Sequence, residues 1–596
     1  MMEGMDIDKL EIIKRKQRLR RAEINSRILE STCTKKIIVS GPGTGKTHMF
    51  REILKTKSGD CLVLTFIRNL AKKLESDLDG QAKVCTFHSF CMGLLHRIKK
   101  NDLSRGFALF PGLEMIIGSD AIILDNENPK FMRSFRDIDL SGGDIEFFLK
   151  RSSYYDAVSF DDSVYRVMEY LKHNSDQVPS YEQILVDEYQ DFNKLEVELI
   201  DILGQKSPIL IVGDDDQALY GKLKSASAKH IRERFNDPKY ESFCLPFCSR
   251  CTSVITGAIS DVIVSARKMD RLTERISKEY VCYFPDKWEN SRKYPKVVCV
   301  SCSVQTKKAP YIARFIEQEI DQLSVEEIRA ANQKADYTIL VAGSGHYLRQ
   351  VQDYFKKLKN KYRLFFRREE SYSEVVKILQ GYSDLLERGN SSNLGWRILL
   401  KFDKLESMRT VLSKTARDPN VNLYRILPNS YVKKHMDILD ILDKLKQEEG
   451  LETSESEKLE KAIGMNVQNI KKKLYEKDEE KDDVVVDTKS DKISVVFSTY
   501  VGCKGLSAGY TFILGLDEGN LPRNNHAPTN IEICQFIVGL ARTVKKCYLF
   551  CTAVFLGEKQ CPSAFIDWID QGRLEFAKVD KQYWEHGRHT NPCRTY

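Results

Sequence analysis

The feature that most constrains the fold of this chain is a glycine-rich segment, Ser40-Gly41-Pro42-Gly43-Thr44-Gly45-Lys46-Thr47. It follows an apolar run at 36–40 and precedes a stretch with helical character. Glycines in such a loop let backbone N–H groups converge on a phosphate, while a lysine and a hydroxyl at its end contact phosphate oxygens and Mg²⁺. The strict pattern begins with glycine, whereas the first residue here is Ser40. The context predicts a phosphate-binding loop on a parallel sheet, with the nucleotide held by Gly41, Gly43, Thr44, Gly45, Lys46 and Thr47.

An acidic partner for this loop follows a second apolar run, at 184–187. Asp187 is expected to coordinate Mg²⁺ together with Thr47, and Glu188 to orient or deprotonate the attacking water. A third run, at 209–213, leads into three acids and then Gln217. Three acids in a row could bind a metal, but the glutamine that follows them favours a loop that senses the γ-phosphate. ATP and Mg²⁺ are therefore the predicted ligands, and Gln217 the predicted sensor.

The spacing of apolar runs predicts how the 596 residues are divided. A chain of this length exceeds one hydrophobic core, because single cores stop growing at about 250–300 residues. Strand-like runs that lead into turn or helix signals indicate a parallel sheet covered by helices. The first set lies at 36–40, 61–66, 184–187 and 209–213, and the second at 297–300, 337–341, 493–498, 510–514 and 547–551. The predicted fold class is therefore α/β, with two parallel-sheet domains that each carry a mainly helical insertion.

The predicted boundaries follow from where the strand pattern stops and helical or charged stretches begin. The first domain takes residues 1–91 and 176–250, with its insertion at 92–175. The second takes 251–355 and 492–575, with its insertion at 356–491, and residues 576–596 form a C-terminal tail.

Composition limits the class of protein. Apolar residues make up 42% of the chain and charged residues 30%, which is typical of a globular protein. No apolar run approaches the roughly 20 residues that a membrane-spanning helix needs, and the acidic N-terminus does not resemble a secretory signal. We therefore expect a cytoplasmic protein without membrane contact. The net charge of +8 permits a polyanion as partner, and the densest basic run, at 14–21, fits a solvated helix face as well as a phosphate contact.

The cysteines form one cluster in the sequence, with Cys244, Cys248 and Cys251 close together and Cys282 further on. Their C-x3-C-x2-C spacing is not a standard zinc pattern. Buried thiols in a strand and at a helix start are therefore favoured over a metal site.

Taken together, these segments resemble superfamily 1 helicases of the UvrD/Rep type, whose two α/β domains are RecA-like. Two further segments, at 65–69 and 86–90, resemble the family segments that grip single-stranded DNA. Aromatic rings stack on bases there and hydroxyls bond to phosphates, although Phe90 alone is a typical core residue. The resemblance implies that single-stranded DNA is the partner, contacted by Thr65, Phe66, Asn69, Thr86, His88, Phe90, Tyr220, Thr499 and Lys504.

The order of the remaining motifs extends the resemblance along most of the chain. Arg250, in the segment 245–250, matches a family arginine that reaches the γ-phosphate. The segments at 499–506 and 538–543 resemble two later family motifs, in which Arg542 would be a second arginine finger. Two cations at one phosphate stabilise transition-state charge and report the nucleotide state. The resemblance also implies travel from 3′ to 5′ along the strand.

The chain departs from the family at several positions. Ser249 stands where a tyrosine usually stacks on adenine, which leaves stacking to another residue such as Phe247. Gln17 lies rather far ahead of the phosphate loop to be the glutamine that reads adenine. The residues expected to carry hydrolysis are all present. The preference for ATP and the contacts with the DNA strand, in contrast, are implied only by the resemblance. Three further positions differ from the family's aromatic, histidine and glutamate, namely Lys222, Val501 and Ser507.

Two other functions stay open. A DNA-activated ATPase switch that hardly unwinds and serves a partner nuclease would resemble the helicase-like component of bacterial anti-phage systems of the Gabija kind. An intrinsic nuclease is suggested only by Asp487-Thr488-Lys489, since no companion acids occur in suitable strands. It also stays open whether the chain moves along RNA instead of DNA.

Overall fold

The computed structural model describes residues 7–66, 68–100, 106–124, 128–367, 374–403, 407–475 and 492–586. Its first sheet consists of β1 (Lys35–Val39), β2 (Cys61–Thr65), β3 (Lys83–Thr86), β6 (Gln183–Val186), β7 (Ile209–Gly213) and β8 (Glu241–Cys244). All six strands run parallel, in the order β3-β2-β6-β7-β1-β8. The central strands β2, β6 and β7 are buried throughout, as expected where helices cover both faces of a parallel sheet.

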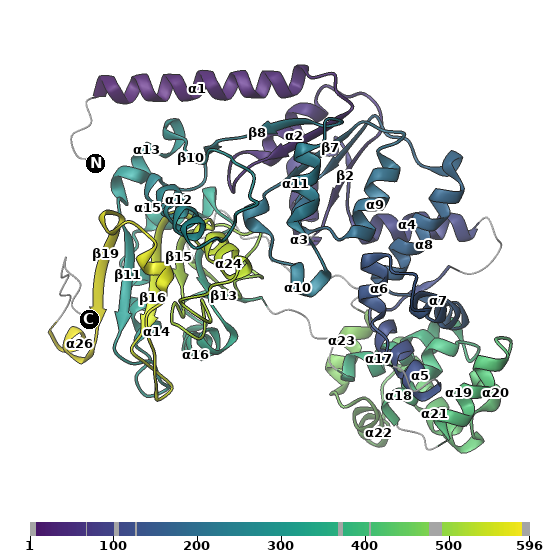
Figure 1. The fold of residues 1–596 in the computed structure, drawn as a ribbon. Helices are drawn as coiled ribbons and strands as arrows, with labels where there is room; N and C mark the ends of the chain where they lie inside the picture. Colours follow the sequence, from purple (N-terminus) through teal and green to yellow (C-terminus); the bar gives the residue numbers. More distant parts are fainter. Residues whose placement is uncertain are drawn as a thin grey trace.

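The second sheet consists of β11 (Val297–Cys302), β12 (Tyr337–Ala342), β13 (Arg363–Phe366), β14 (Ser494–Ser498), β15 (Ala508–Ile513), β16 (Thr543–Thr552) and β19 (Leu574–Val579). Its seven strands are also parallel, in the order β13-β14-β12-β15-β16-β11-β19. The two sheets with their surrounding helices (Figure 1) confirm the predicted α/β class with two RecA-like domains.

The helices around the two sheets are α1 (Ile7–Glu30), α2 (Lys46–Leu54), α3 (Arg68–Leu78), α4 (Phe87–Lys100), α8 (Phe160–His173), α9 (Lys194–Leu203), α10 (Gly221–Lys224), α11 (Ala228–Asn236), α12 (Ser253–Lys268), α13 (Phe284–Lys293), α14 (Tyr311–Asp321), α15 (Val325–Lys334), α16 (Gly345–Phe355), α24 (Asn530–Leu540), α25 (Ala564–Asp567) and α26 (Lys581–His586). On the first sheet, α1, α2 and α3 bury apolar side chains against one face and α4, α8 and α9 against the other. On the second sheet, α12 and α24 cover one face and α14 and α16 the other. Alternate strand residues supply the two layers, because successive side chains of a strand point to opposite faces.

Two helical insertions leave the sheets. The first joins β3 to β6 and adds α5 (Leu113–Leu124), α6 (Phe131–Asp137), α7 (Asp144–Tyr155) and the short strands β4 (Ala108–Leu109) and β5 (Ala157–Val158). The second joins β13 to β14 and holds α17 (Glu374–Arg388), α18 (Asn393–Asp403), α19 (Met408–Arg417), α20 (Leu423–Ile426), α21 (Asn429–Lys446), α22 (Thr453–Ile463) and α23 (Val467–Tyr475). Although they are far apart in the sequence, the insertions pack together, with α5 against α18 and α19 (Figure 1).

A buried ion cluster lies where the two insertions meet. Asp120 of α5 is fully buried, and its carboxylate accepts hydrogen bonds from Arg151 Nε of α7 at 2.9 Å and from Arg397 Nε of α18 at 2.8 Å. The hydroxyl of Tyr155 donates to the same carboxylate at 2.5 Å. Nearby, the hydroxyl of Tyr154 donates to the carbonyl oxygen of Val421 at 2.9 Å. The joint between the insertions is therefore an interior region with paired charges.

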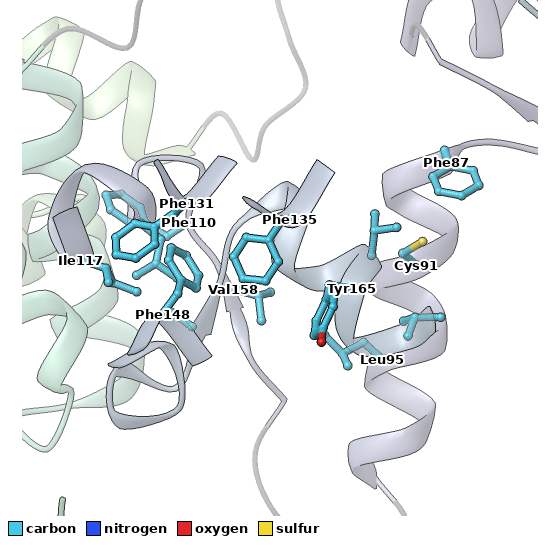
Figure 2. Packing of buried hydrophobic residues seen from close by; sticks show 14 of the residues in the cluster. Phe87, Cys91, Leu95, Phe110, Ile117, Phe131, Phe135, Phe148, Val158 and Tyr165 are labelled. Carbon is cyan, nitrogen blue, oxygen red and sulfur yellow. The ribbon is translucent and has the colours of Figure 1, made fainter. Parts of the chain in front are cut away.

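Apolar packing runs without a break from the first sheet into both insertions. One cluster of buried side chains includes Ile37 of the sheet, Phe148 of the first insertion and Trp396 of the second. Figure 2 shows its middle portion, where Phe135 lies between the group around Phe148 and the helix that carries Phe87. The second sheet has apolar layers of its own, so the second insertion shares its core with the first domain.

Two boundaries predicted from the sequence are wrong. The second insertion does not begin at 356, because β13 pairs with β14 and belongs to the second sheet. Residues from 576 onward are not simply a tail, because β19 pairs with β11 and α26 follows it. Both strands lie at sheet edges, where partly exposed residues interrupt the apolar pattern. The other boundaries stay predictions.

Other sequence-based expectations have these outcomes. Cys248 and Cys251 lie buried in the short strand β9 (Phe247–Cys248) and just before α12. None of the helices in the described ranges is both long enough and apolar enough to span a membrane. The segment 487–489, on which the nuclease hypothesis depends, lies outside the described residues.

Candidate active site

The glycine-rich loop joins β1 to α2 at the carboxyl edge of the first sheet. Gly43 and Gly45 have φ angles of 71° and 97°, a left-handed conformation that favours glycine. A Cβ atom on Gly43 would lie 2.4 Å from Cβ of Arg250, so a larger residue does not fit. The loop borders a cavity of about 720 Å³, which Lys46 lines from the first domain and Ser507 from the second. A cavity of this size suits a small-molecule ligand, and it opens between the two domains.

Asp187 and Glu188 follow β6 at the same edge of the sheet. Glu188 has a φ angle of 55°, a strained conformation that is often found at functional sites. Its carboxylate lies 3.8 Å from Lys46 Nζ and 3.6 Å from Lys504 Nζ. Burial alone would raise the pKa of Glu188, but these two cations hold the pKa below its ordinary value. Glu188 is therefore an ionised group that can orient a water molecule and accept its proton.

Asp187 has the properties of a magnesium ligand. Its Oδ1 atom is buried and has no hydrogen-bond partner among the described residues, which is costly unless a cation compensates. Burial and the negative charge of Glu188 raise the pKa of Asp187, and the nearby charges of Lys46 and Lys504 offset only part of this rise. Thr47 follows Lys46 on the cavity wall. A carboxylate and a hydroxyl are oxygen donors of the kind that Mg²⁺ prefers, so the residues present fit the predicted ion.

Gln217 connects the two domains through its side chain and its backbone. Its Nε2 atom donates to Asp214 Oδ2 at 2.5 Å, and its Oε1 atom accepts from Arg542 Nη2 at 2.9 Å. The carbonyl oxygen of Gln217 accepts from Lys504 Nζ at 2.8 Å. Lys504 also forms an ion pair of 2.5 Å with Asp191, and both side chains are buried. Because Lys504 and Arg542 come from loops of the second sheet, residues of both domains meet at this glutamine.

The two predicted arginine fingers lie next to each other. Arg250 lines the cavity, and its Nη1 atom donates to the carbonyl oxygen of Ala541 at 3.4 Å. Arg542 is the next residue and is almost fully buried. Burial and the neighbouring charge of Arg250 lower the pKa of Arg542. The structure thus brings the two arginines together, with Arg250 on the cavity wall and Arg542 buried beside it. Their role at the γ-phosphate stays a prediction.

An aromatic and basic cluster adjoins this site. The rings of Phe66 and Tyr220 have centroids 5.5 Å apart, and Lys224 Nζ lies 3.5 Å from the centroid of Phe66. Lys504 Nζ lies 5.6 Å from the ring of Tyr220, so the cluster reaches the nucleotide site through cation–π contacts. The ring of His88 is 6.4 Å from that of Phe66. Burial, Lys224 and Arg136 lower the pKa of His88 to about 3, which keeps the imidazole neutral at physiological pH.

The other predicted DNA contacts are placed differently. Phe90 is only 2% exposed and Thr65 is fully buried, so both are core positions and neither offers a surface to a strand. Their prediction as DNA contacts is therefore corrected. The hydroxyls of Thr86 and Thr499 accept local backbone hydrogen bonds and stay partly exposed. Asn69 belongs to α3, and its side chain is outside the described part of the chain.

The region beside Ser249 contains a residue that the sequence analysis missed. Arg21 of α1 donates from Nη1 to Ser249 Oγ at 2.9 Å, and its guanidinium lies 4.5 Å from the ring centroid of Tyr283. The amide of Gln17 is bound to backbone groups of Cys282 and Phe284. Part of the basic run at 14–21 therefore packs on the body of the protein. No local pattern around Arg21 could have related it to Ser249.

This geometry defines the class of protein. The site has the parts of a P-loop nucleoside-triphosphate hydrolase with two RecA-like domains. These are a glycine-rich phosphate loop, an acidic pair after another strand of the same sheet, and two arginines, of which Arg250 precedes α12 and Arg542 precedes β16 of the second sheet. Residues 24–222 match the family model described as an AAA domain. In its motifs and its matched sequence the chain is similar to the superfamily 1 helicases of the UvrD/Rep type, and these similarities support an ATP-hydrolysing DNA helicase.

Curated relatives are similar to this chain at low identity. The probable DNA helicase II homolog of Mycoplasma genitalium is 22% identical over 638 residues, which cover 91% of this chain and 86% of the relative. DNA helicase II of Haemophilus influenzae is 26% identical over 48% of this chain and 44% of its own length. The ATP-dependent DNA helicase PcrA of Staphylococcus epidermidis is 24% identical over 38% of this chain and 37% of its own length. The match thus spans most of the first relative and less than half of the other two.

Proposed function

We propose that this chain moves along single-stranded DNA from 3′ to 5′, driven by ATP hydrolysis in the cavity between its two domains. The observation that carries the proposal is the position of Lys504, which belongs to the loop after β14. Its Nζ atom is 2.5 Å from Asp191 Oδ2 and 2.8 Å from the carbonyl oxygen of Gln217. A displacement of the loop around Gln217 therefore acts on the second domain through a buried contact. Such a contact can couple hydrolysis to domain movement.

The roles in hydrolysis follow from these contacts. Lys46 neutralises phosphate charge, Glu188 orients the attacking water, and Gln217 senses the γ-phosphate. The two arginines stabilise the charge that develops in the transition state. Mg²⁺ held by Thr47 and Asp187 would withdraw charge from the phosphate oxygens.

The aromatic and basic cluster supports the proposal that the protein moves along a single strand of nucleic acid. Tyr220 and Lys224 are partly exposed, and an aromatic ring beside a cation suits a stacked base and a phosphate. Phe66 and Lys504 are buried behind them, so their prediction as direct DNA contacts is corrected and they support the cluster from within. Tyr220 follows Gln217 by three residues, so the same loop would respond to nucleotide and to strand. The names of the relatives, which are DNA helicases, favour DNA over RNA. The direction of travel is taken from the family resemblance.

Replacement of Glu188 by glutamine tests the hydrolytic assignment. Because the amide cannot accept the proton of the attacking water, we expect kcat to fall by about 100-fold or more, with nucleotide binding little changed. Lys46→Ala should weaken binding as well as hydrolysis. The measurement is steady-state ATP hydrolysis with and without single-stranded DNA. Glu198→Gln is a matched control, since Glu198 is a partly exposed glutamate of α9 that pairs with Lys172.

Normal turnover in Lys46→Ala would contradict the nucleotide site. Strand displacement from duplexes with a 3′ or a 5′ single-stranded tail tests the direction, and faster displacement from the 5′ tail would contradict it. Hydrolysis that DNA stimulates without any loss of duplex would instead support a switch that serves a partner nuclease. Stronger stimulation by single-stranded RNA than by DNA would contradict the proposed track.

A further inference from the structure

Lys278 lies among the three acids that precede Gln217. Its Nζ atom is 3.0 Å from Asp214, 2.5 Å from Asp215 and 2.8 Å from Asp216, and its side chain is 2% exposed. These acids are the one group in the described ranges whose spacing could hold a metal ion. The ammonium group of Lys278 already supplies positive charge there. The lysine therefore takes the place that the sequence left open for a metal.

Asp214 stands between Lys278 and the sensor glutamine. Its Oδ1 atom pairs with Lys278, while its Oδ2 atom accepts from Nε2 of Gln217. The other two acids have additional cations, since Arg232 pairs with Asp215 and Arg275 pairs with Asp216. Among the ion pairs of the described residues, Asp214 has only Lys278 as its partner. The orientation of Gln217 thus depends on a carboxylate that one lysine neutralises.

The segment that carries Lys278 is itself fixed to the phosphate loop. Two residues later, the hydroxyl of Tyr280 donates to the carbonyl oxygen of Pro42 at 3.0 Å. The ring of Tyr280 fills the space beside Gly41, where a Cβ atom would lie 2.5 Å from it. The next residues form β10 (Val281–Cys282), which pairs with β9. Lys278 is therefore held against the sensor loop by a segment with little freedom to move.

We propose that Lys278 is a positioning residue for the sensor. Its ammonium group holds the carboxylate of Asp214 in place, and Asp214 orients the amide of Gln217 toward the γ-phosphate and Arg542. The inference rests on the proposed role of Gln217. Without Lys278, the buried carboxylate of Asp214 loses its ion-pair partner and turns away. This change alters the orientation of the amide of Gln217. The site then distinguishes poorly between nucleotides with and without a γ-phosphate, while the phosphate loop still binds the phosphates that both share.

The test compares the affinities of Lys278→Met for ADP and for a non-hydrolysable ATP analogue, both with Mg²⁺, by titration calorimetry. We expect the preference for the triphosphate to fall by about fivefold or more. In parallel, kcat with single-stranded DNA should fall by about tenfold, and KM for ATP should rise with the loss of affinity for the triphosphate. Arg275→Met is the matched control, because it removes a cation from the same segment that pairs with Asp216. Its nucleotide preference should stay close to that of the wild type.

A double variant separates positioning from folding. In Lys278→Met/Asp214→Asn the amide at position 214 can still accept from Gln217 but needs no cation, so the triphosphate preference should recover. An unchanged preference in Lys278→Met, or an equal loss in Arg275→Met, would overturn the inference. So would a loss of folded protein in Lys278→Met, measured by thermal unfolding, that the double variant does not restore. Because nucleotide preference is measured without turnover, a wild-type chain that distinguishes the nucleotides but hydrolyses none would count against the proposed function alone.

Discussion

Arg542 has its guanidinium group fixed by three acceptors from different segments. It donates to the carbonyl oxygen of Val538 at 3.0 Å, to that of Leu506 at 3.1 Å and to Gln217 Oε1 at 2.9 Å. The planar guanidinium can serve several acceptors at once, whereas lysine presents a single ammonium group. Two of the acceptors belong to the second domain and one to the first. The side chain is thus oriented by its own domain and responds to the position of the other.

Arg542→Lys tests whether this geometry matters beyond charge. The substitution keeps the positive charge and removes the forked contacts, so we expect kcat to fall by about tenfold or more, with a smaller effect on KM for ATP. The measurement is steady-state hydrolysis at saturating single-stranded DNA. Arg573→Lys is the control, because Arg573 pairs with Asp261 and lies outside the site. A wild-type kcat in Arg542→Lys would show that charge alone suffices.

Residues whose chemistry depends on local spacing could be predicted from the sequence. Lys46 and Glu188 lie just after strands, where the pattern of a phosphate loop and of an acidic pair can be recognised. Lys278 and Arg21 could not be predicted, because their roles come from contacts with residues far away in the chain. Phe90 shows the opposite error. Its motif resembles one that contacts single-stranded DNA, but its side chain lies on the apolar face of α4 and is buried.

Among the helices, α5 brings a carboxylate into an apolar setting. Glu114 lies near its start, where Ser159 Oγ donates to it at 3.4 Å. Burial and the negative charge of Asp161 raise the pKa of Glu114 from 4.5 to about 8. Within that range of pH the folded chain holds a proton that the unfolded chain has released. Stability therefore falls as pH rises through the range, and the penalty is complete above about pH 8.

Glu114→Gln should remove this dependence, because glutamine carries no proton that titrates. Near about pH 5 the variant and the wild type should unfold at similar temperatures. At about pH 9 the variant should unfold at a higher temperature, by at least the ~2–4 °C that corresponds to about 1 kcal/mol in a unit of 150–250 residues. Thermal unfolding across the pH range measures the difference. A difference that does not vary with pH would contradict the raised pKa of Glu114.

Strands could be predicted where they lie inside a sheet and not where they lie at an edge. All nine strand-like runs of the sequence form strands, because a strand buried on both faces is a continuous apolar run. The missed strands β3, β8, β13 and β19 are the four edges of the two sheets. Their partly exposed residues break the pattern. The fold class therefore followed from the central strands alone.

At the scale of the whole molecule, the ion cluster around Asp120 holds the two insertions together. Arg151 and Arg397 come from different insertions, and both lie within 2.8 Å of the carboxylate of Asp120. Buried charges of this kind depend strongly on their partner. The sequence could not predict the contact, because no local pattern relates residues so far apart in the chain.

Asp120→Asn should destabilise the protein by about 3–5 kcal/mol, because it leaves two buried guanidinium groups without a counter-charge. We expect a lower unfolding temperature and faster proteolysis within the two insertions. Replacing all three residues by apolar ones, as Asp120→Leu, Arg151→Met and Arg397→Met, should restore most of the stability. A triple variant as unstable as Asp120→Asn would show that the loss comes from shape and not from charge.

The continuous apolar cluster also bears on how the chain is made. The last strand of the first sheet ends at Cys244, but the faces of α5 and α7 that meet the second insertion pack against α18 and α19. The later of these two helices, α19, ends at Arg417. Domains generally fold as they leave the ribosome, at about 5–20 residues per second, so the interval lasts roughly 10–35 s. Throughout it, the nascent first domain presents an uncovered apolar surface to the cell. The order of synthesis therefore sets a period in which a chaperone has a binding site that the finished protein no longer offers.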